Sequence, residues 1–471
     1  MVAGYLQGNP FRSYFDIAIP YGFPEHLRVE HAVVVAGTGG GKTQLIENLI
    51  LADLDADDPC SMVIIDSKTG ENSLLHRISR LDEFNPRTGR LRDRIIIIDP
   101  KDKPALNMFD VDAELVTTKI NEVAALIRYF LSSLLGNELS NQMNVLFLPL
   151  LHIILRKKGA TLHDFVDVVK NPHQYPEIID QLPRGPKAFI WDQYNDPVYR
   201  VTKSSIITRL YEIINESTLD DMFSAPRNAI KLSEALNVGK IVLVSTDAAG
   251  LQHLSPLFGR WFIAQVMNAG LARASVPGKK RPIHFYIDEC APYVDDKLSD
   301  MLTTIRSYGI GLLLAFQGTW QMGSHHRAIQ GNTAIKLMGS VEEVDAKAFA
   351  SDMRTTPDFI MQQGKARGGN PTHGNLACYT RDLPSAISVQ NPFGELDKRQ
   401  WMSERDYQQL RRENKVRVGS GDVPLLLAPS SSPPPSPPAP PAKPKRQPAG
   451  RKTPIKRAPP KNDEDDPTAI G

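Results

Sequence analysis

Cysteine, long apolar runs and an excess of either charge are all scarce in this chain of 471 residues. The three cysteines, Cys60, Cys290 and Cys378, are odd in number and far apart, which argues against a disulfide framework or a zinc site and favours a reducing compartment. The apolar stretch NVLFLPLLHIIL is too short to cross a bilayer and contains Pro149 and His152. We therefore expect a soluble cytoplasmic protein without a transmembrane segment.

Charge is nearly balanced, with 55 Lys and Arg against 53 Asp and Glu. Because the dense basic cluster lies near the end of the chain, in 443–461, any nucleic-acid surface on the remainder must be local, such as a pore or groove. Of the 37 prolines, 15 fall in 424–471, a composition that cannot bury a core. We predict a disordered, Pro-rich basic tail over 426–471. It could bind DNA, an acidic partner or a membrane surface, or serve as a solvated linker.

Apolar, β-branched runs recur along the chain and predict buried strands. They are 32–36, 62–66, 94–99, 240–246, 283–288, 311–316 and 334–339. Helical patterns lie between several of them, at 251–274, 296–308 and 342–352. Continuous apolar strands alternating with helices indicate an α/β domain with a mostly parallel, doubly wound sheet.

One interval, 113–236, breaks this alternation because it shows helical patterns and no convincing buried strand. We interpret it as an all-α domain inserted between two strands. The chain is then predicted to comprise four parts. They are an irregular N-terminal segment (1–30), a discontinuous α/β domain (31–112 and 237–425), the inserted all-α domain (113–236) and the tail (426–471).

The stretch HAVVVAGTGGGKTQLIENLI, which starts at His31, joins a predicted strand to a predicted helix through a glycine cluster. Glycines allow backbone N–H groups to close around an anion, and the helix presents its N-terminus to the same anion. Lys42 is expected to reach the β/γ-phosphates, and the Thr43 hydroxyl to ligate Mg²⁺. The alternative is a flexible turn with a chance lysine. The predicted nucleotide-binding residues are Ala36, which replaces the usual glycine, Gly37, Thr38, Gly39, Gly40, Gly41, Lys42 and Thr43.

A second signal is RPIHFYIDECAPYVDD, in which a hydrophobic strand ends in Asp288 and Glu289. An aspartate at that strand end can hold the water shell of Mg²⁺ opposite Thr43, and Glu289 can polarise an attacking water. The alternative is a pair of surface acids that cap the next helix.

A third signal is TTIRSYGIGLLLAFQGTWQM, which starts at Thr303. Gln317 ends its buried strand, and a place beside the strand of Asp288 would bring it close to a γ-phosphate. Arg306 precedes the strand and could neutralise transition-state charge if supplied to another subunit. The alternatives are a polar strand end for Gln317 and a solvated helix residue for Arg306.

The segments AGTGGGKT, IDE and RSYGIGLLLAFQ, in this order, resemble the HerA/FtsK class of additional-strand P-loop ATPases. Within that class the chain looks most like the TraG/TraD-type coupling ATPases of conjugation and type IV secretion. The segments IIDSKTGE (64–71) and IIIIDPKDKPALNMFD (95–110) resemble further parts of that family, with Thr69 inserted and Met108 in place of a proline. The resemblance covers roughly 30–390.

The resemblance implies a RecA-like core, a homohexameric ring with ATP sites between subunits, Mg²⁺ as cofactor, and DNA in the central channel. By the same match, Lys42 and Thr43 bind nucleotide and metal, and Asp288 holds the metal through water. Glu289 then activates water, Gln317 senses the phosphate and Arg306 acts in trans. Secretion-machinery or relaxosome proteins are the implied partners. Membrane-anchored members begin with transmembrane helices, so this chain is either a soluble relative or is recruited to the inner membrane face through partners.

These signals leave four functions open. The first is a DNA translocase in conjugative transfer or type IV secretion, an ATPase stimulated by DNA. The second is a HerA-like DNA-processing or packaging ATPase that acts with a nuclease or other effector; a HerA relative would carry an N-terminal barrel, and 30 residues precede the first strand. The third is a protein-handling secretion ATPase, and the fourth a P-loop protein without turnover, against which Glu289 argues.

Several weaker signals stay undecided between structure and function. Asp66 and Lys68 follow a strand near the expected nucleotide site. The glycine-rich segment 362–375 contains Lys365 and Arg367, which could contact phosphates. Trp320 could stack on exposed bases or pack in the core.

Overall fold

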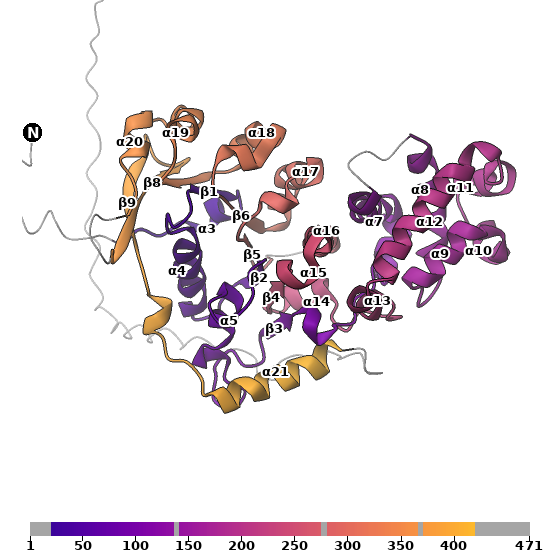
Figure 1. The fold of residues 1–471 in the computed structure, drawn as a ribbon, viewed down its shortest axis with the longest axis horizontal. Helices are drawn as coiled ribbons and strands as arrows, with labels where there is room; N and C mark the ends of the chain where they lie inside the picture. Colours follow the sequence, from indigo (N-terminus) through magenta and orange to yellow (C-terminus); the bar gives the residue numbers. More distant parts are fainter. Residues whose placement is uncertain (1–19, 136–140, 275–279, 366–370, 420–471) are drawn as a thin grey trace, which may run out of the picture. The chain divides into compact units, whose positions relative to one another are not determined.

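The computed structural model describes residues 20–135, 141–274, 280–365 and 371–419. A sheet of nine strands, in the order β3-β4-β2-β5-β6-β1-β7-β8-β9, runs through the centre of this part of the chain (Figure 1). The strands are β1 (Ala32–Ala36), β2 (Ser61–Asp66), β3 (Ile95–Ile98), β4 (Ile241–Ser245), β5 (Ile283–Ile287), β6 (Ile310–Phe316), β7 (Ile335–Gly339), β8 (His373–Thr380) and β9 (Ile387–Pro392). Strands β1 to β7 are parallel, and β8 and β9 are antiparallel. The predicted mostly parallel sheet is confirmed.

Strand β6 lies between β1, which leads into the glycine cluster, and β5, which leads into Asp288. Val35 of β1 pairs with Phe316 of β6, and Ile287 of β5 pairs with Leu314 of the same strand. Because all three strands are parallel, their carboxyl ends meet at one edge of the sheet. The position of β6 between β5 and β1 is the additional-strand arrangement that the resemblance implied.

Helices cover both faces of the sheet. On one face α4 (Lys42–Asp55), α5 (Leu74–Ser79) and α21 (Glu404–Val418) share an apolar core with the strands. Figure 1 shows α14 (Leu232–Asn237), α16 (Ser255–Ala274) and α17 (Asp296–Thr304) on the other side. The remaining short helices around the sheet are α3 (Glu25–Arg28), α15 (Ala248–Leu251), α18 (His326–Asn332), α19 (Glu343–Ala350) and α20 (Pro357–Met361).

Between β3 and β4 the described residues form helices and no strand, as the sequence predicted. Besides α14, the α-helices there are α6 (Ala113–Thr118), α7 (Ile120–Leu135), α8 (Asn141–Ile154), α9 (Leu162–Lys170), α10 (Pro176–Asp180), α11 (Arg184–Ala188), α12 (Arg200–Ile214) and α13 (Ser217–Phe223). Helix α7 packs on α16, which explains why α16 buries residues around its whole circumference. That this segment is a separate domain stays a prediction.

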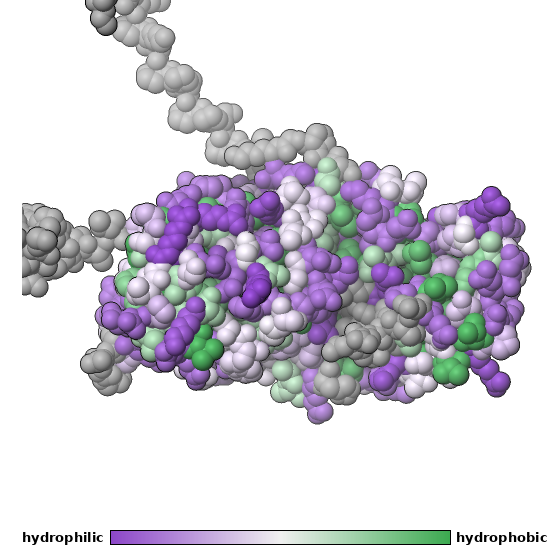
Figure 2. Space-filling model, turned by 90° about the horizontal axis from the view of Figure 1, so that it is seen from above, coloured by the Kyte–Doolittle hydropathy of each residue, from purple (hydrophilic) through white to green (hydrophobic). Residues whose placement is uncertain are grey.

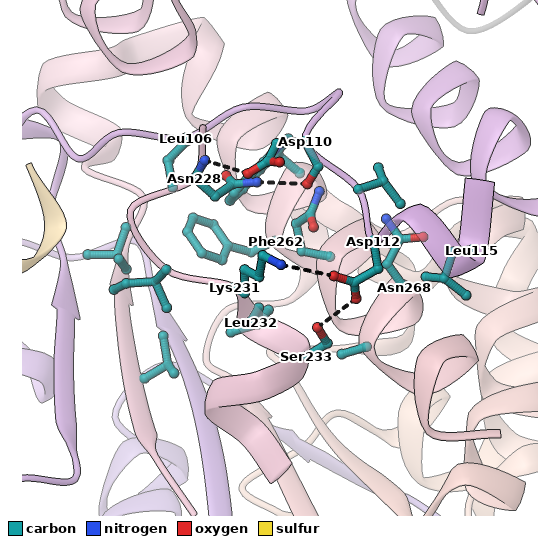
Figure 3. A pocket seen from close by; sticks show the side chains of 17 residues that line it. Leu106, Asp110, Asp112, Leu115, Asn228, Lys231, Leu232, Ser233, Phe262 and Asn268 are labelled. Carbon is teal, nitrogen blue, oxygen red and sulfur yellow. Dashed lines mark hydrogen bonds and ion pairs between the residues drawn. The ribbon is translucent and has the colours of Figure 1, made fainter. Parts of the chain in front are cut away.

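The two chain connections that lead into and out of this helical segment are fastened to each other. The Asn228 side chain accepts the N–H of Asn107 at 2.7 Å and donates to the Asn107 carbonyl at 2.9 Å. The N–H of Asn228 donates to Asp110 at 2.8 Å, a contact visible in Figure 3. These bonds satisfy backbone groups that would otherwise be unpaired between two elements.

Helix α21 closes one edge of the sheet. The side-chain amide of Asn414 donates to the Ile97 carbonyl at 2.7 Å and accepts the Ile97 N–H at 2.8 Å. It therefore pairs with edge strand β3 as a neighbouring strand would. Neither α21 nor the β8–β9 hairpin was predicted from the sequence.

The face in Figure 2 is mainly hydrophilic, with hydrophobic side chains in small separate patches. In the described part of the chain, none of the helices combines the length and the apolarity that crossing a membrane requires. The predicted disordered tail, 426–471, lies outside the described residues, as does most of the predicted N-terminal segment.

Candidate active site

The glycine cluster connects β1 to α4 and forms a loop suited to anions. Gly39 has φ +71° and Gly41, the residue before α4, has φ +90°, values that residues other than glycine rarely adopt. The first turn of a helix has backbone N–H groups without intrahelical acceptors, and these point out of the start of α4. The loop thus presents N–H donors and the positive end of a helix to the same space.

Lys42 lies buried at the start of α4 and crosses the loop. Its Nζ donates to the Ala36 carbonyl at 2.5 Å and approaches the Gly37 carbonyl at 3.4 Å. Burial lowers the pKa of Lys42, although Asp288 and Glu289 act in the opposite direction. A phosphate bound in the loop would add negative charge beside this ammonium group and offset the cost of its burial.

Thr43 and Asp288 come together, as the sequence predicted. The Thr43 hydroxyl donates to the Asp288 carboxylate at 2.9 Å, and Asp288 is buried just beyond the end of β5. A hydroxyl and a carboxylate are hard oxygen ligands, the kind that Mg²⁺ prefers with water and phosphate. The pair fits a magnesium ion beside the phosphate loop.

Glu289 follows Asp288 and has φ +54°, an uncommon backbone conformation for a residue other than glycine. Such conformations cost about 1–3 kcal/mol and cluster at functional sites. The Lys68 Nζ lies 3.0 Å from the Glu289 carboxylate and 3.7 Å from that of Asp288. Burial opposes the charge of Lys68, but the two carboxylates outweigh it and raise its pKa. Lys68 therefore compensates the charge of both acids.

Asp66 fixes the loop that carries Lys68. Its buried carboxylate accepts the N–H groups of Lys68 at 2.9 Å and Leu74 at 3.0 Å. Burial raises the pKa of Asp66 to about 6, and the neighbouring Asp288 acts in the same direction. The sequence left Asp66 and Lys68 undecided; the structure places both beside the candidate site.

Gln317 lies where the sequence predicted, at the end of β6 beside the phosphate loop. Its side-chain carbonyl is 3.4 Å from the Thr38 hydroxyl, and its backbone N–H donates to Gln321 at 2.7 Å. A polar side chain in the pocket that Glu289 also lines can form a hydrogen bond to a terminal phosphate, and this bond is lost when the phosphate is released.

Two further side chains line the same pocket, which opens to solvent. They are Lys365, before β8, and Phe393, directly after β9. The ring of Phe393 packs so closely on Gly41 that a Cβ there would lie 2.9 Å from it. The sequence left Lys365 undecided and missed Phe393, because the hairpin that brings both to the loop was not predicted.

Arg306 is not in this pocket. It is exposed, within the short helix Ile305–Tyr308 that precedes β6, whereas Gln317 follows the same strand. At about 3.3 Å per strand residue, the two ends of β6 are roughly 20 Å apart. Within one subunit the predicted arginine therefore cannot reach the phosphate loop.

Comparison with known proteins supports the resemblance predicted from the motifs. Residues 282–382 match the family described as the TraM recognition site of TraD and TraG. The plasmid coupling protein TrwB, in a complex with ADP and Mg²⁺, has a similar fold, with TM-score 0.53 and 16% identity over 82% of this chain and 89% of that one. VirB4 of Thermoanaerobacter pseudethanolicus is also similar, with TM-score 0.52 and 14% identity over 80% of this chain and 90% of that one.

These findings confirm the likeness to TraG/TraD-type coupling ATPases and their P-loop fold. A search of the curated proteins by sequence found no match. At such low identity the structural likeness concerns the fold, so the roles of individual residues stay predictions.

Proposed function

We propose that this chain is an ATP-hydrolysing motor that moves DNA in conjugative transfer or type IV secretion. The observation that carries the proposal is the meeting of Thr43, Asp288 and Glu289 at the phosphate loop, with Gln317 between them on the inserted strand. Proteins that only bind a nucleotide need the loop, whereas a hydrolase also needs a base beside it. The family match over 282–382 supports the assignment to conjugation.

Different residues of the site bind the phosphates, sense the terminal phosphate and accept a proton. The loop N–H groups and Lys42 bind and orient the phosphates, and Gln317 reads the terminal one. The Glu289 carboxylate accepts the proton of the attacking water, which requires that Lys68 leave room for that water beside the carboxylate. TrwB has been observed with ADP and Mg²⁺. Here Thr43 and Asp288 would hold the ion, which supplies positive charge against the phosphate oxygens.

We further propose that subunits form a ring, with hexamers as the form that the resemblance implies. Arg306 is exposed and lies at the far end of β6 from the phosphate loop of its own subunit. A neighbouring subunit could bring its Arg306 to that loop, which would make hydrolysis depend on assembly. Trp320, with 75% of its surface exposed, follows Gln317 and could stack on DNA bases in the channel.

The test is steady-state ATP hydrolysis by the purified chain, alone and with saturating single-stranded or double-stranded DNA. The Lys42→Ala variant is the blank, since loss of the ammonium group should abolish binding or turnover. We expect DNA to raise the rate several-fold. Hydrolysis that DNA does not change would contradict the DNA motor and favour a protein-handling secretion ATPase. Undiminished hydrolysis by Lys42→Ala would contradict the site itself.

A further inference from the structure

A second lysine, Lys365, reaches from a distant part of the chain over the phosphate loop at Gly39, a position that we call the crest of the loop. The Nζ of Lys365 lies 3.4 Å from the place that a Cβ on Gly39 would occupy. Lys365 also lines the pocket that contains Lys42 and Thr43. The two lysines thus face one pocket from different sides, Lys42 from α4 and Lys365 from the segment before β8.

The backbone that carries Lys365 is held in place. The chain at Lys365 forms an antiparallel bridge with Gly374, and the Gly364 carbonyl accepts the N–H of Asn375 at 2.8 Å. One residue earlier, the Gln363 carbonyl accepts the N–H of Ser340 at 3.0 Å. Residues 363–365 are therefore fixed between the end of β7 and the start of β8.

Ser340 connects this segment to the phosphate loop. Its carbonyl accepts the N–H of Gly37 at 3.2 Å, and a Cβ on Gly37 would lie only 2.8 Å from that oxygen. A Cβ on Gly364 would likewise lie 3.0 Å from the Ser340 hydroxyl. Because these segments are in close contact, packing and hydrogen bonds hold the backbone of Lys365 next to the phosphate loop.

The charges in the pocket differ in how they are paired. Lys68 is paired with Glu289 and Asp288, and Lys42 donates to loop carbonyls. Within the described ranges, Lys365 has neither an acidic partner nor a hydrogen-bond acceptor for its Nζ. An exposed ammonium group that lies over an anion-binding loop without a counter-charge is suited to an anion that enters with the ligand.

We propose that Lys365 binds the α- and β-phosphates of the nucleotide and acts as a second phosphate-binding lysine beside Lys42. The inference rests on the proposed ATPase function. The crest of a phosphate loop holds the α/β-phosphates through its backbone, and Lys42 and Gln317 serve the terminal end. Lys365 at the crest should therefore contribute to holding ATP and ADP alike, and leave the hydrolytic step unchanged.

The test compares equilibrium binding of a non-hydrolysable ATP analogue and of ADP, by calorimetry, in the wild type and in Lys365→Ala. Loss of a charge-assisted hydrogen bond should weaken both affinities by about tenfold, while kcat at saturating ATP changes less than about twofold. Lys365→Arg keeps the charge and should bind within a few-fold of wild type. Lys347→Ala, which removes an exposed lysine paired with Glu343 on α19, is the matched control and should bind like wild type.

The outcomes separate this inference from the proposed function. If Lys365→Ala binds both nucleotides as tightly as wild type while Lys42→Ala binds neither, the role of Lys365 is overturned and the ATPase stands. Weaker binding of the ATP analogue alone would overturn the α/β placement. A fall in kcat at unchanged affinity would overturn the binding role. If wild type binds no nucleotide, the proposed function fails together with the inference. Matching thermal unfolding curves of the variants exclude misfolding as the cause.

Discussion

The two ends of strand β5 carry similar side chains but are organised in opposite ways. Near the amino end, His284 and Tyr286 of the strand join Asp53 and Arg28 in a largely buried group that we call the amino-end cluster. The Asp53 carboxylate accepts from Tyr286 at 2.6 Å, is 2.7 Å from His284 and accepts from Arg28 at 3.0 Å. Both carboxylate oxygens of Asp53 thus have hydrogen-bond partners within the protein.

At the other end, Asp288 and Glu289 meet one compensating lysine, Lys68, and a loop with free N–H donors. The N–H groups of the loop and the charged side chains face an open pocket, where some of them have no partner in the described part of the protein. A cluster of charges therefore marks a functional site by the groups that are left without a partner in the protein. The number of charges alone would not separate the two ends.

The largest expected effect on hydrolysis concerns Arg306, which belongs to neither of the two sites at the ends of β5 in its own subunit. Arg306→Ala should lower kcat by about 10³-fold or more if it stabilises transition-state charge in a neighbouring subunit. Hydrolysis should be measured with Arg306→Ala subunits alone and mixed with Lys42→Ala subunits. Mixed rings contain interfaces with an intact loop and an intact arginine, so partial recovery is expected. Absence of recovery would leave the trans role without support.

A substitution at the carboxyl end should separate binding from chemistry. Glu289→Gln keeps the size and polarity of the side chain but cannot accept the proton of water. We expect ATP affinity within a few-fold of wild type and a kcat lower by about 10²–10⁴-fold, measured in single-turnover hydrolysis. A normal rate would remove Glu289 from the mechanism.

A substitution at the amino end should affect stability instead. Asp53→Ala leaves Arg28 and His284 buried without their carboxylate, and removal of one partner from a buried charge pair costs about 3–5 kcal/mol. Denaturant unfolding should show this loss, and nucleotide affinity of the folded protein should be unchanged. Asp57→Ala removes an exposed acid from the same region and should change stability by less than about 0.5 kcal/mol. Weaker nucleotide binding by Asp53→Ala would contradict the independence of the two ends.

The smallest expected effect depends on pH. The folded pKa of Asp66 is about 6, against an ordinary value of 3.8, so its carboxyl favours folding while it is protonated. That contribution is present below about pH 4 and is lost as pH rises to 6, a loss of about 3 kcal/mol. Asp66→Asn cannot ionise, so its stability relative to wild type should improve by this amount over the same range. Unfolding curves at pH 4, 5, 6 and 7 measure it, and a constant difference would contradict the shifted pKa.

The sequence predicted what depends on local pattern. Strands β1 and β5 are buried along their whole length and end in residues with recognisable phosphate chemistry, so the pairing of Thr43 with Asp288 followed from the two motifs. Strand β9 could not be predicted in this way, because its residues are mostly exposed or half-buried and only its pairing with β8 makes it a strand. Lys365 and Phe393 depend on that hairpin, so their contacts with the loop could not be predicted from spacing.

The side chain of Asn414 has a consequence for assembly. By occupying both hydrogen-bonding groups of Ile97, it prevents another chain from adding a strand to the sheet at β3. In the proposed ring, neighbouring subunits would meet at this edge through side chains, and such a contact can form and break without disrupting backbone hydrogen bonds between strands. A chain shortened to end before Glu404 would lose α21 and Asn414. Strand β3 would then be an unprotected edge strand, and we expect copies of the shortened chain to aggregate irreversibly.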